Sequence, residues 1–203
     1  MDAKANKLQF YKSNIFNYLL VLLIVLIILT FYFKYVWLSL VLAIVAVVYF
    51  RHVKSFTHGL EGEADVSDQL RKLPPEFSFV SDISIGGRGN IDKIVFGPTG
   101  VWVLEVKSHQ GRIRTQDPKF IKQVWAESYA VRNLIKEKLN LDITVQPVLV
   151  FSSPRAKLHF GFNKVEGVYV IGKSWLNDLI IMHPVSNLDR DIVSQIQTVL
   201  RVK

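Results

Sequence analysis

The sequence predicts an α/β domain, built as a mixed sheet flanked by helices in the order αβββαβ and preceded by a two-helix transmembrane hairpin. Two observations lead to this prediction: one long apolar segment near the N-terminus and, after it, short apolar strands that alternate with amphipathic helices. The 203 residues are 50% hydrophobic and 21% charged, which excludes a disordered chain. The absence of cysteine excludes a disulfide scaffold, a thiolate zinc site and a cysteine nucleophile.

The apolar segment comes first. Residues 15–50 carry one formal charge, Lys34. As a single helix they would extend about 54 Å, nearly twice the roughly 30 Å hydrocarbon core of a bilayer. A break near Lys34 leaves two spans, 15–33 and 35–50, of which the second is short for a full crossing. A cleaved signal peptide is disfavoured, because its apolar core would be shorter and end in small residues. A re-entrant or interfacial segment remains the alternative.

Basic residues flank this segment on both sides, and they predict its orientation. Lys4, Lys7 and Lys12 precede it, and Arg51 and Lys54 follow it. By the positive-inside rule we expect a multi-pass protein of the cell membrane, with both termini and the soluble domain in the cytoplasm. Residues 1–58 hold +5 of the formal charge of +8, so the domain itself is only mildly basic. The expected boundaries are a basic tail over 1–14, the hairpin over 15–50, a polar linker over 51–58 and the domain over 59–203.

Within the domain, apolar periodicity and turn residues place the elements in order. A helix over 59–73 ends at Pro74-Pro75. Alternating or apolar strands and amphipathic helices then follow: strands over 77–85, 91–96 and 101–107, a helix over 119–139, strands over 145–151 and 168–171, and helices over 174–181 and 187–202.

Two of these strands carry charged residues that the expected strand pairing brings close together. Glu105 and Lys107 are two apart in a strand and therefore share a face. A hairpin closed symmetrically at Gly97-Pro98-Thr99-Gly100 places Asp92 directly opposite Glu105. Paired carboxylates repel unless a cation neutralises them, and hard oxygen ligands suit Mg²⁺ or Mn²⁺. The pattern fits a metal-assisted phosphodiesterase with Lys107 holding a phosphate oxygen or activating water, or else an exposed cross-strand ion cluster.

The same residues carry a resemblance. Gly62-Glu63 opening a helix, Asp92, the stretch from Gly97 to Val101 and then Glu105-Val106-Lys107 resemble the nuclease-related domain, NERD, a branch of the PD-(D/E)xK nucleases, over about residues 60–180. The resemblance implies a restriction-endonuclease-like fold and a Mg²⁺- or Mn²⁺-dependent nuclease. It also implies the roles of individual residues: Asp92 and Glu105 as metal ligands, Glu63 as a further acid binding metal or orienting water, Lys107 as the catalytic lysine, and Gln123 beside the site.

Basic residues near these positions are expected to bind the phosphate backbone of a nucleic acid, with DNA as the expected partner. They are Arg88, Arg112, Arg114, Lys119 and Lys122. Residues 167–174 satisfy the phosphate-loop pattern, but their strand-forming middle favours a strand followed by a helix capped by Ser174, so no nucleotide cofactor is expected. Two non-catalytic alternatives stay open: a nucleic-acid-binding or membrane scaffold module that keeps the nuclease fold, and a hairpin that oligomerises while the domain responds to a partner.

Overall fold

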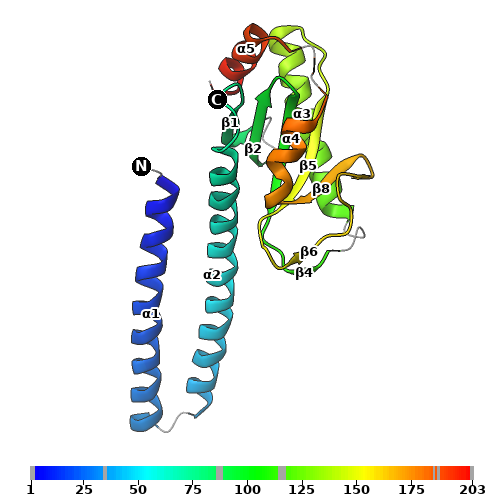
Figure 1. The fold of residues 1–203 in the computed structure, drawn as a ribbon. Helices are drawn as coiled ribbons and strands as arrows, with labels where there is room; N and C mark the ends of the chain where they lie inside the picture. Colours follow the sequence, from blue (N-terminus) through cyan, green and yellow to red (C-terminus); the bar gives the residue numbers. More distant parts are fainter. Residues whose placement is uncertain are drawn as a thin grey trace. The chain divides into compact units, whose positions relative to one another are not determined.

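The structure, a computed structural model, describes residues 3–33, 36–85, 89–113, 118–184, 186 and 188–201. The chain divides into two compact units, Met1–Ala64 and Asp65–Lys203. The first unit is helical: α1 spans Ala3–Phe33, and α2 begins at Val36 and continues to Leu70 in the second unit. The two helices run in opposite directions (Figure 1). The predicted break at Lys34 therefore falls between them.

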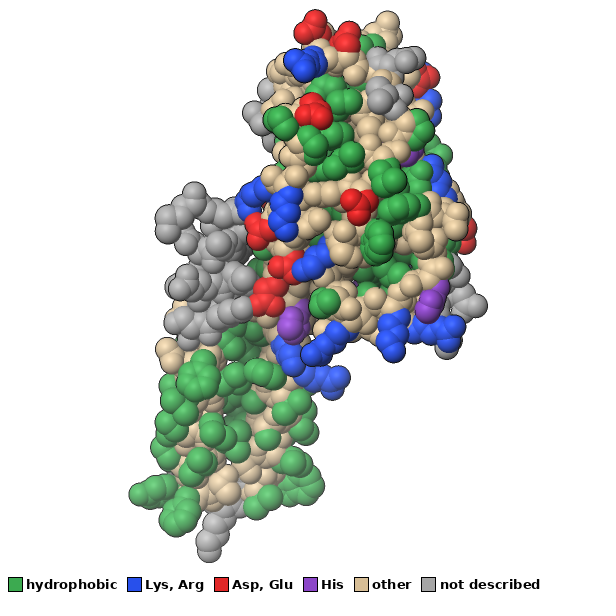
Figure 2. All heavy atoms as spheres, in the orientation of Figure 1, with side chains coloured by type: hydrophobic (Ala, Val, Ile, Leu, Met, Phe, Trp, Pro, Cys, Tyr) green, Lys and Arg blue, Asp and Glu red, His purple; other side chains and the backbone are tan. Residues whose placement is uncertain are grey.

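Both helices of the first unit are long and apolar enough to cross a membrane. The apolar stretch of α1 covers Asn14–Tyr32, and none of it is buried. Hydrophobic side chains cover the surface of this unit (Figure 2). Aromatic residues near the ends of the two helices that face the break are strongly exposed: Phe31 is 85% exposed and Trp37 is 80% exposed. In a soluble protein such a surface would be an aggregation hazard, so its exposure agrees with a hairpin that lipid covers.

The predicted linker and the predicted domain helix are both wrong in one respect, because they belong to a single helix. Residues 51–58 lie inside α2, which runs unbroken from the apolar segment to Leu70. Gly62 and Glu63 therefore lie in the helix interior and do not open a new helix. The predicted tail over 1–14 is likewise helical from Ala3. The physical reason is that these polar residues include no proline, and extending a helix costs less than nucleating another one.

The second unit is built on a six-stranded mixed sheet of order β1-β2-β3-β5-β8-β7. The first three strands are antiparallel, β3, β5 and β8 are parallel, and β7 is antiparallel to β8. A separate pair joins β4 and β6. The bounds are β1 Ser78–Ser84, β2 Asn90–Gly97, β3 Gly100–Lys107, β4 Gly111–Arg112, β5 Val145–Phe151, β6 Ala156–Lys157, β7 Lys164–Val165 and β8 Val168–Gly172.

Helices cover both faces of the sheet, as predicted. On one face lie α3 (Pro118–Leu139) and α5 (Arg190–Arg201), whose apolar residues pack on β1, β2 and β3. The other face buries Trp102, Leu104 and Val148 under the end of α2 and under α4 (Leu176–Met182). The αβββαβ core is therefore confirmed, and its strand bounds lie within two residues of those predicted.

Local chemistry explains both ends of α3 and the start of α5, and it corrects one prediction. Pro118 opens α3, where its missing N–H costs nothing, and Asn140, with a φ of 54°, follows its end. Asp189 caps α5 by accepting a hydrogen bond from the N–H of Ile192 at 2.8 Å. Ser174 was predicted to cap a helix, but it lies inside a 3₁₀ turn, Lys173–Trp175, that leads into α4 without a side-chain cap.

Candidate active site

The β2–β3 hairpin pairs in the predicted register from its turn as far as Lys93 opposite Leu104. Asp92 and Glu105, predicted to face each other, lie one step beyond this last pair. There Asp92 connects the strands through its side chain: Oδ2 accepts a hydrogen bond from the backbone N–H of Val106 at 2.7 Å. The carboxylate of Asp92 is therefore held at the point where the backbone ladder of the hairpin ends.

Glu105 and Lys107 share one face of β3, as the alternation predicts. Glu105 is only 3% exposed, and the ammonium group of Lys107 donates a hydrogen bond to its Oε1. The second oxygen of Glu105, Oε2, is buried without a hydrogen-bond donor among the described residues. A buried carboxylate oxygen without a donor costs free energy. The geometry therefore leaves a place for a positively charged group at this oxygen.

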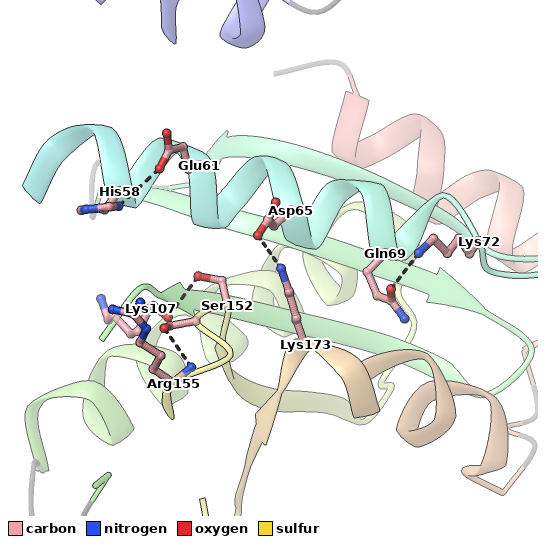
Figure 3. Close-up of polar contacts among 10 residues, drawn as sticks. His58, Glu61, Asp65, Gln69, Lys72, Lys107, Ser152, Arg155 and Lys173 are labelled. Carbon is pink, nitrogen blue, oxygen red and sulfur yellow. Dashed lines mark hydrogen bonds and ion pairs between the residues drawn. The ribbon is translucent and has the colours of Figure 1, made fainter. Parts of the chain in front are cut away.

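Lys107 is held from two further directions. Its ammonium nitrogen lies 4.7 Å from the ring centroid of Phe120, close enough for a cation–π contact. Its backbone carbonyl accepts a hydrogen bond from the backbone N–H of Ser152 at 3.0 Å. The hydroxyl of Ser152 donates to the same carbonyl at 3.4 Å (Figure 3). Both bonds tie the end of β3 to the residue after β5. Lys107 is therefore positioned both at its backbone and at its charged end.

Helix α3 contributes a third carboxylate, Glu127, which the sequence interpretation did not include. Its Oε1 accepts a hydrogen bond from Nε2 of Gln123 at 3.0 Å, and its Oε2 is buried without a donor in the described part of the chain. Burial, followed by the negative charge of Glu105, raises the pKa of Glu127 to about 8, and the charge of Asp92 acts in the same direction. Three carboxylates therefore influence one another at the open end of the hairpin.

A signal for Glu127 was present in the sequence. Gln123 and Glu127 are four residues apart and therefore share one face of α3. The helix follows directly on the strand that carries Glu105 and Lys107. Extending the Gln123 assignment by one helical turn would have found the acid. Gln123 donates its hydrogen bond to Glu127, and its role at the site stays a prediction.

A groove of about 510 Å³ opens beside these acids. Its walls come from the start of β2 and from one face of α3, and they include Lys119, Lys122, Gln123 and Glu127. Two of the predicted phosphate-binding lysines therefore line the same groove as Glu127. A positively charged channel leading to an acidic centre suits a polyanionic substrate.

The other predicted basic residues fall elsewhere. Arg112 lies in β4, where it pairs in register with Lys157 of β6. Arg88 and Arg114 lie outside the described residues. The aromatic pair Trp125 and Tyr129, which the sequence places one helical turn apart, is stacked at 5.3 Å, and the indole N–H of Trp125 donates to the carbonyl of Glu166 at 3.0 Å.

Glu63 lies in α2, within the first unit, so its role at the site stays a prediction. No group of three or more acidic, histidine or cysteine side chains is arranged to hold a metal among the residues that the structure describes. Mg²⁺ needs fewer, because it commonly takes one or two carboxylates and completes its shell with water and phosphate oxygens. Glu105 and Glu127 fit that requirement, since each has a buried carboxylate oxygen without a donor.

Comparison with known families agrees with this geometry. Residues 58–152 match the family described as the nuclease-related domain, NERD. The match ends at Ser152, earlier than the 60–180 range expected from the sequence, and it includes Asp92, Glu105 and Lys107 on the strands and Gln123 and Glu127 on α3. Neither the curated proteins nor the solved structures contain a match to this chain. Residues 58–152 thus match the nuclease-related domain, and this match begins inside α2, the second of the two apolar helices.

Proposed function

We propose that this chain is a membrane-anchored, cytoplasm-facing nuclease that hydrolyses phosphodiester bonds of nucleic acid with the help of Mg²⁺ or Mn²⁺. The observation that supports it best is the ion pair between the buried Glu105 and the partly buried Lys107. Burying a carboxylate with one oxygen paired to a lysine, and the other without a donor among the described residues, is costly for a purely structural role. Such a pair, next to a second orphaned carboxylate and a basic groove, has the composition of a phosphoryl-transfer site.

Each residue has a chemical task in this proposal. Glu105 and Glu127 would hold the metal through their unpartnered oxygens, with Asp92 alongside. When bound, the metal would polarise the phosphodiester and lower the pKa of a water molecule. Lys107 would bind a non-bridging phosphate oxygen or the attacking water, and its contact with Phe120 keeps its ammonium group in place. Lys119 and Lys122 would hold the flanking phosphates in the groove.

The membrane assignment rests on the two apolar helices and their flanking charges. Lys4, Lys7 and Lys12 in the first turns of α1, together with Arg51 and Lys54 in α2, predict that both ends of the hairpin face the cytoplasm. The chain lacks cysteine, so single cysteines introduced as Lys34→Cys and Asn133→Cys can report the topology. In intact cells a membrane-impermeant maleimide is expected to label the first variant only. Labelling of Asn133→Cys without permeabilisation would refute the cytoplasmic location.

The activity is tested on the full chain in lipid nanodiscs, incubated with labelled single-stranded and duplex DNA and RNA under Mg²⁺, Mn²⁺ or Ca²⁺. We expect cleavage with Mg²⁺ or Mn²⁺ that Glu105→Gln and Lys107→Met abolish. The matched controls are Glu137→Gln and Lys138→Met, which change the same residue types in the exposed last turns of α3. Cleavage that survives both site variants would refute the mechanism. Salt-sensitive binding without turnover under any divalent ion would instead support the non-catalytic binding module.

A further inference from the structure

A second cavity lies at the same end of the sheet as the candidate active site, where the parallel strands β3, β5 and β8 end. It has a volume of about 420 Å³ and lies at the carboxyl ends of β5 and β8. We call it the aromatic pocket, defined by Phe162 and Trp175 together with Leu158, Lys173 and Ser174. Neither the proposed catalytic residues nor the groove along α3 contributes a side chain to its lining.

The two aromatic rings of this pocket are unusually open to solvent. Phe162 is 42% exposed and Trp175 is 58% exposed. Their ring centroids lie 6.0 Å apart with an interplanar angle of 81°. Two nearly perpendicular rings form a corner in which a third flat ring can stack on one and meet the other at its edge. Lys173 at the rim forms an ion pair with Asp65 (Figure 3).

Strand register connects the pocket to Lys107. Lys107 of β3 pairs with Phe151 of β5, and Phe151 pairs with Gly172 of β8. Phe151 and Gly172 both line the aromatic pocket. The pocket therefore begins at the neighbouring strand and extends about two strand spacings, or roughly 10 Å, from Lys107 along one edge of the sheet. A nucleic acid strand bound at Lys107 reaches this far within a few nucleotides.

A basic strip borders the pocket. In the segment around β6, Ala156 and Leu158 line the pocket while Arg155 and Lys157 are exposed. Lys157 is in register with Arg112 of β4, and like charges on adjacent strands destabilise a sheet. Within the described residues no acidic side chain lies within ion-pair distance of Arg112, Arg155 or Lys157. A polyanion is the natural partner of these three side chains.

We propose that the aromatic pocket binds an unpaired base of the nucleic acid, stacked on Trp175 and bounded by Phe162, while the backbone follows Arg112, Arg155 and Lys157. This inference deepens the proposed function and rests on it for the nature of the ligand. It names the substrate class: a single strand, or a single-stranded end of a duplex. Stacking on an aromatic ring needs a free base face, which a base inside a duplex does not offer.

The test measures binding without turnover. The full chain in phosphatidylcholine nanodiscs is titrated, in EDTA, against a fluorescein-labelled 20-nucleotide single strand and against the blunt duplex of the same sequence, by fluorescence anisotropy. Wild-type chain is expected to bind the single strand more tightly. Trp175→Ala should weaken single-strand binding by about tenfold and leave duplex binding nearly unchanged. Trp175→Phe, which keeps an aromatic face, should restore most of the affinity.

Tyr129→Ala is the matched control, because Tyr129 is also an exposed aromatic residue but lies on α3, outside the aromatic pocket. It should bind like the wild-type chain. Equal affinity of Trp175→Ala and wild type for the single strand would overturn the inference, as would equal losses on single strand and duplex, or no detectable binding. Cleavage with unchanged binding by Trp175→Ala would refute the pocket alone. Trp175-dependent binding without cleavage under any divalent ion would refute the nuclease alone.

Discussion

The two halves of the β2–β3 hairpin under helix α3 have opposite chemistry. Near the turn, Ile94, Phe96 and Val103 are fully buried against apolar residues of the C-terminal half of α3, such as Val131 and Ile135. At the open end, the same strands present carboxylates to the N-terminal half of the same helix. One helix therefore covers a hydrophobic core at one end and a cluster of acids at the other.

This difference shows where the fold gains stability and where it gives stability up. The turn half follows ordinary core rules, in which every buried side chain adds apolar contact. In the open half, one side-chain oxygen each of Glu105 and Glu127 is buried without a hydrogen-bond partner in the described part of the chain, and the two acids lie close enough for Glu105 to raise the pKa of Glu127. Sites that break a local rule of this kind are commonly functional. We therefore interpret the open half as the candidate site and the turn half as the packed core that supports it.

The sharpest test of this division is Glu105→Gln in the open half. We expect cleavage to fall by about a thousandfold, because a neutral amide holds a divalent cation and orients Lys107 poorly. The thermal unfolding temperature should stay the same or rise, since the buried charge is removed. Cleavage rates per mole of folded protein and unfolding followed by tryptophan fluorescence give the two readouts. A large drop in unfolding temperature would make Glu105 a structural residue.

The reverse pattern is expected for Ile94→Ala in the turn half. Ile94 is fully buried, so the cavity should cost about 2–5 kcal/mol of unfolding free energy. The cleavage rate of the molecules that remain folded should change little, because Ile94 contacts core residues only. Denaturant titration and the activity at low temperature measure these quantities. Loss of activity in fully folded protein would show that the two halves are coupled.

The same contrast explains how much the sequence could predict. The turn half followed from apolar alternation and the Gly97–Gly100 turn, and these also placed Glu105 and Lys107 on one face. Glu127 was missed because periodicity shows which residues of a helix share a face but not which strand they cover. The unbroken α2 was missed because its polar residues resemble a linker, and no local signal distinguishes a linker from a helix that simply continues.

Glu127 allows a pH test of the open half. Burial and the charge of Glu105 raise its pKa from an ordinary 4.5 to about 8. Between these values the folded chain keeps a proton that the unfolded chain has released, so the unfolding free energy falls as the pH rises from 4.5 to 8. In EDTA, Glu127→Gln should remove this slope and exceed wild-type stability at pH 9 by on the order of 1–2 kcal/mol. The control is Glu137→Gln, and parallel pH profiles of wild type and Glu127→Gln would contradict the assigned environment.

The smallest expected effect comes from removing one lysine at either end of α3 and comparing how tightly the two variants bind a single strand. Lys122 lines the groove at the open half, whereas Lys138 lies in the last turn of the helix beyond the core half. If the groove carries the phosphate backbone, Lys122→Ala should weaken single-strand binding by about two- to fivefold. It should also reduce the slope of the logarithm of the binding constant against the logarithm of the salt concentration by the value of about one phosphate contact. Lys138→Ala removes an equal charge from the same helix, so it measures how much of the effect comes from the lower net charge alone. Equal salt slopes for the two variants would mean that the phosphate backbone does not follow the groove along α3.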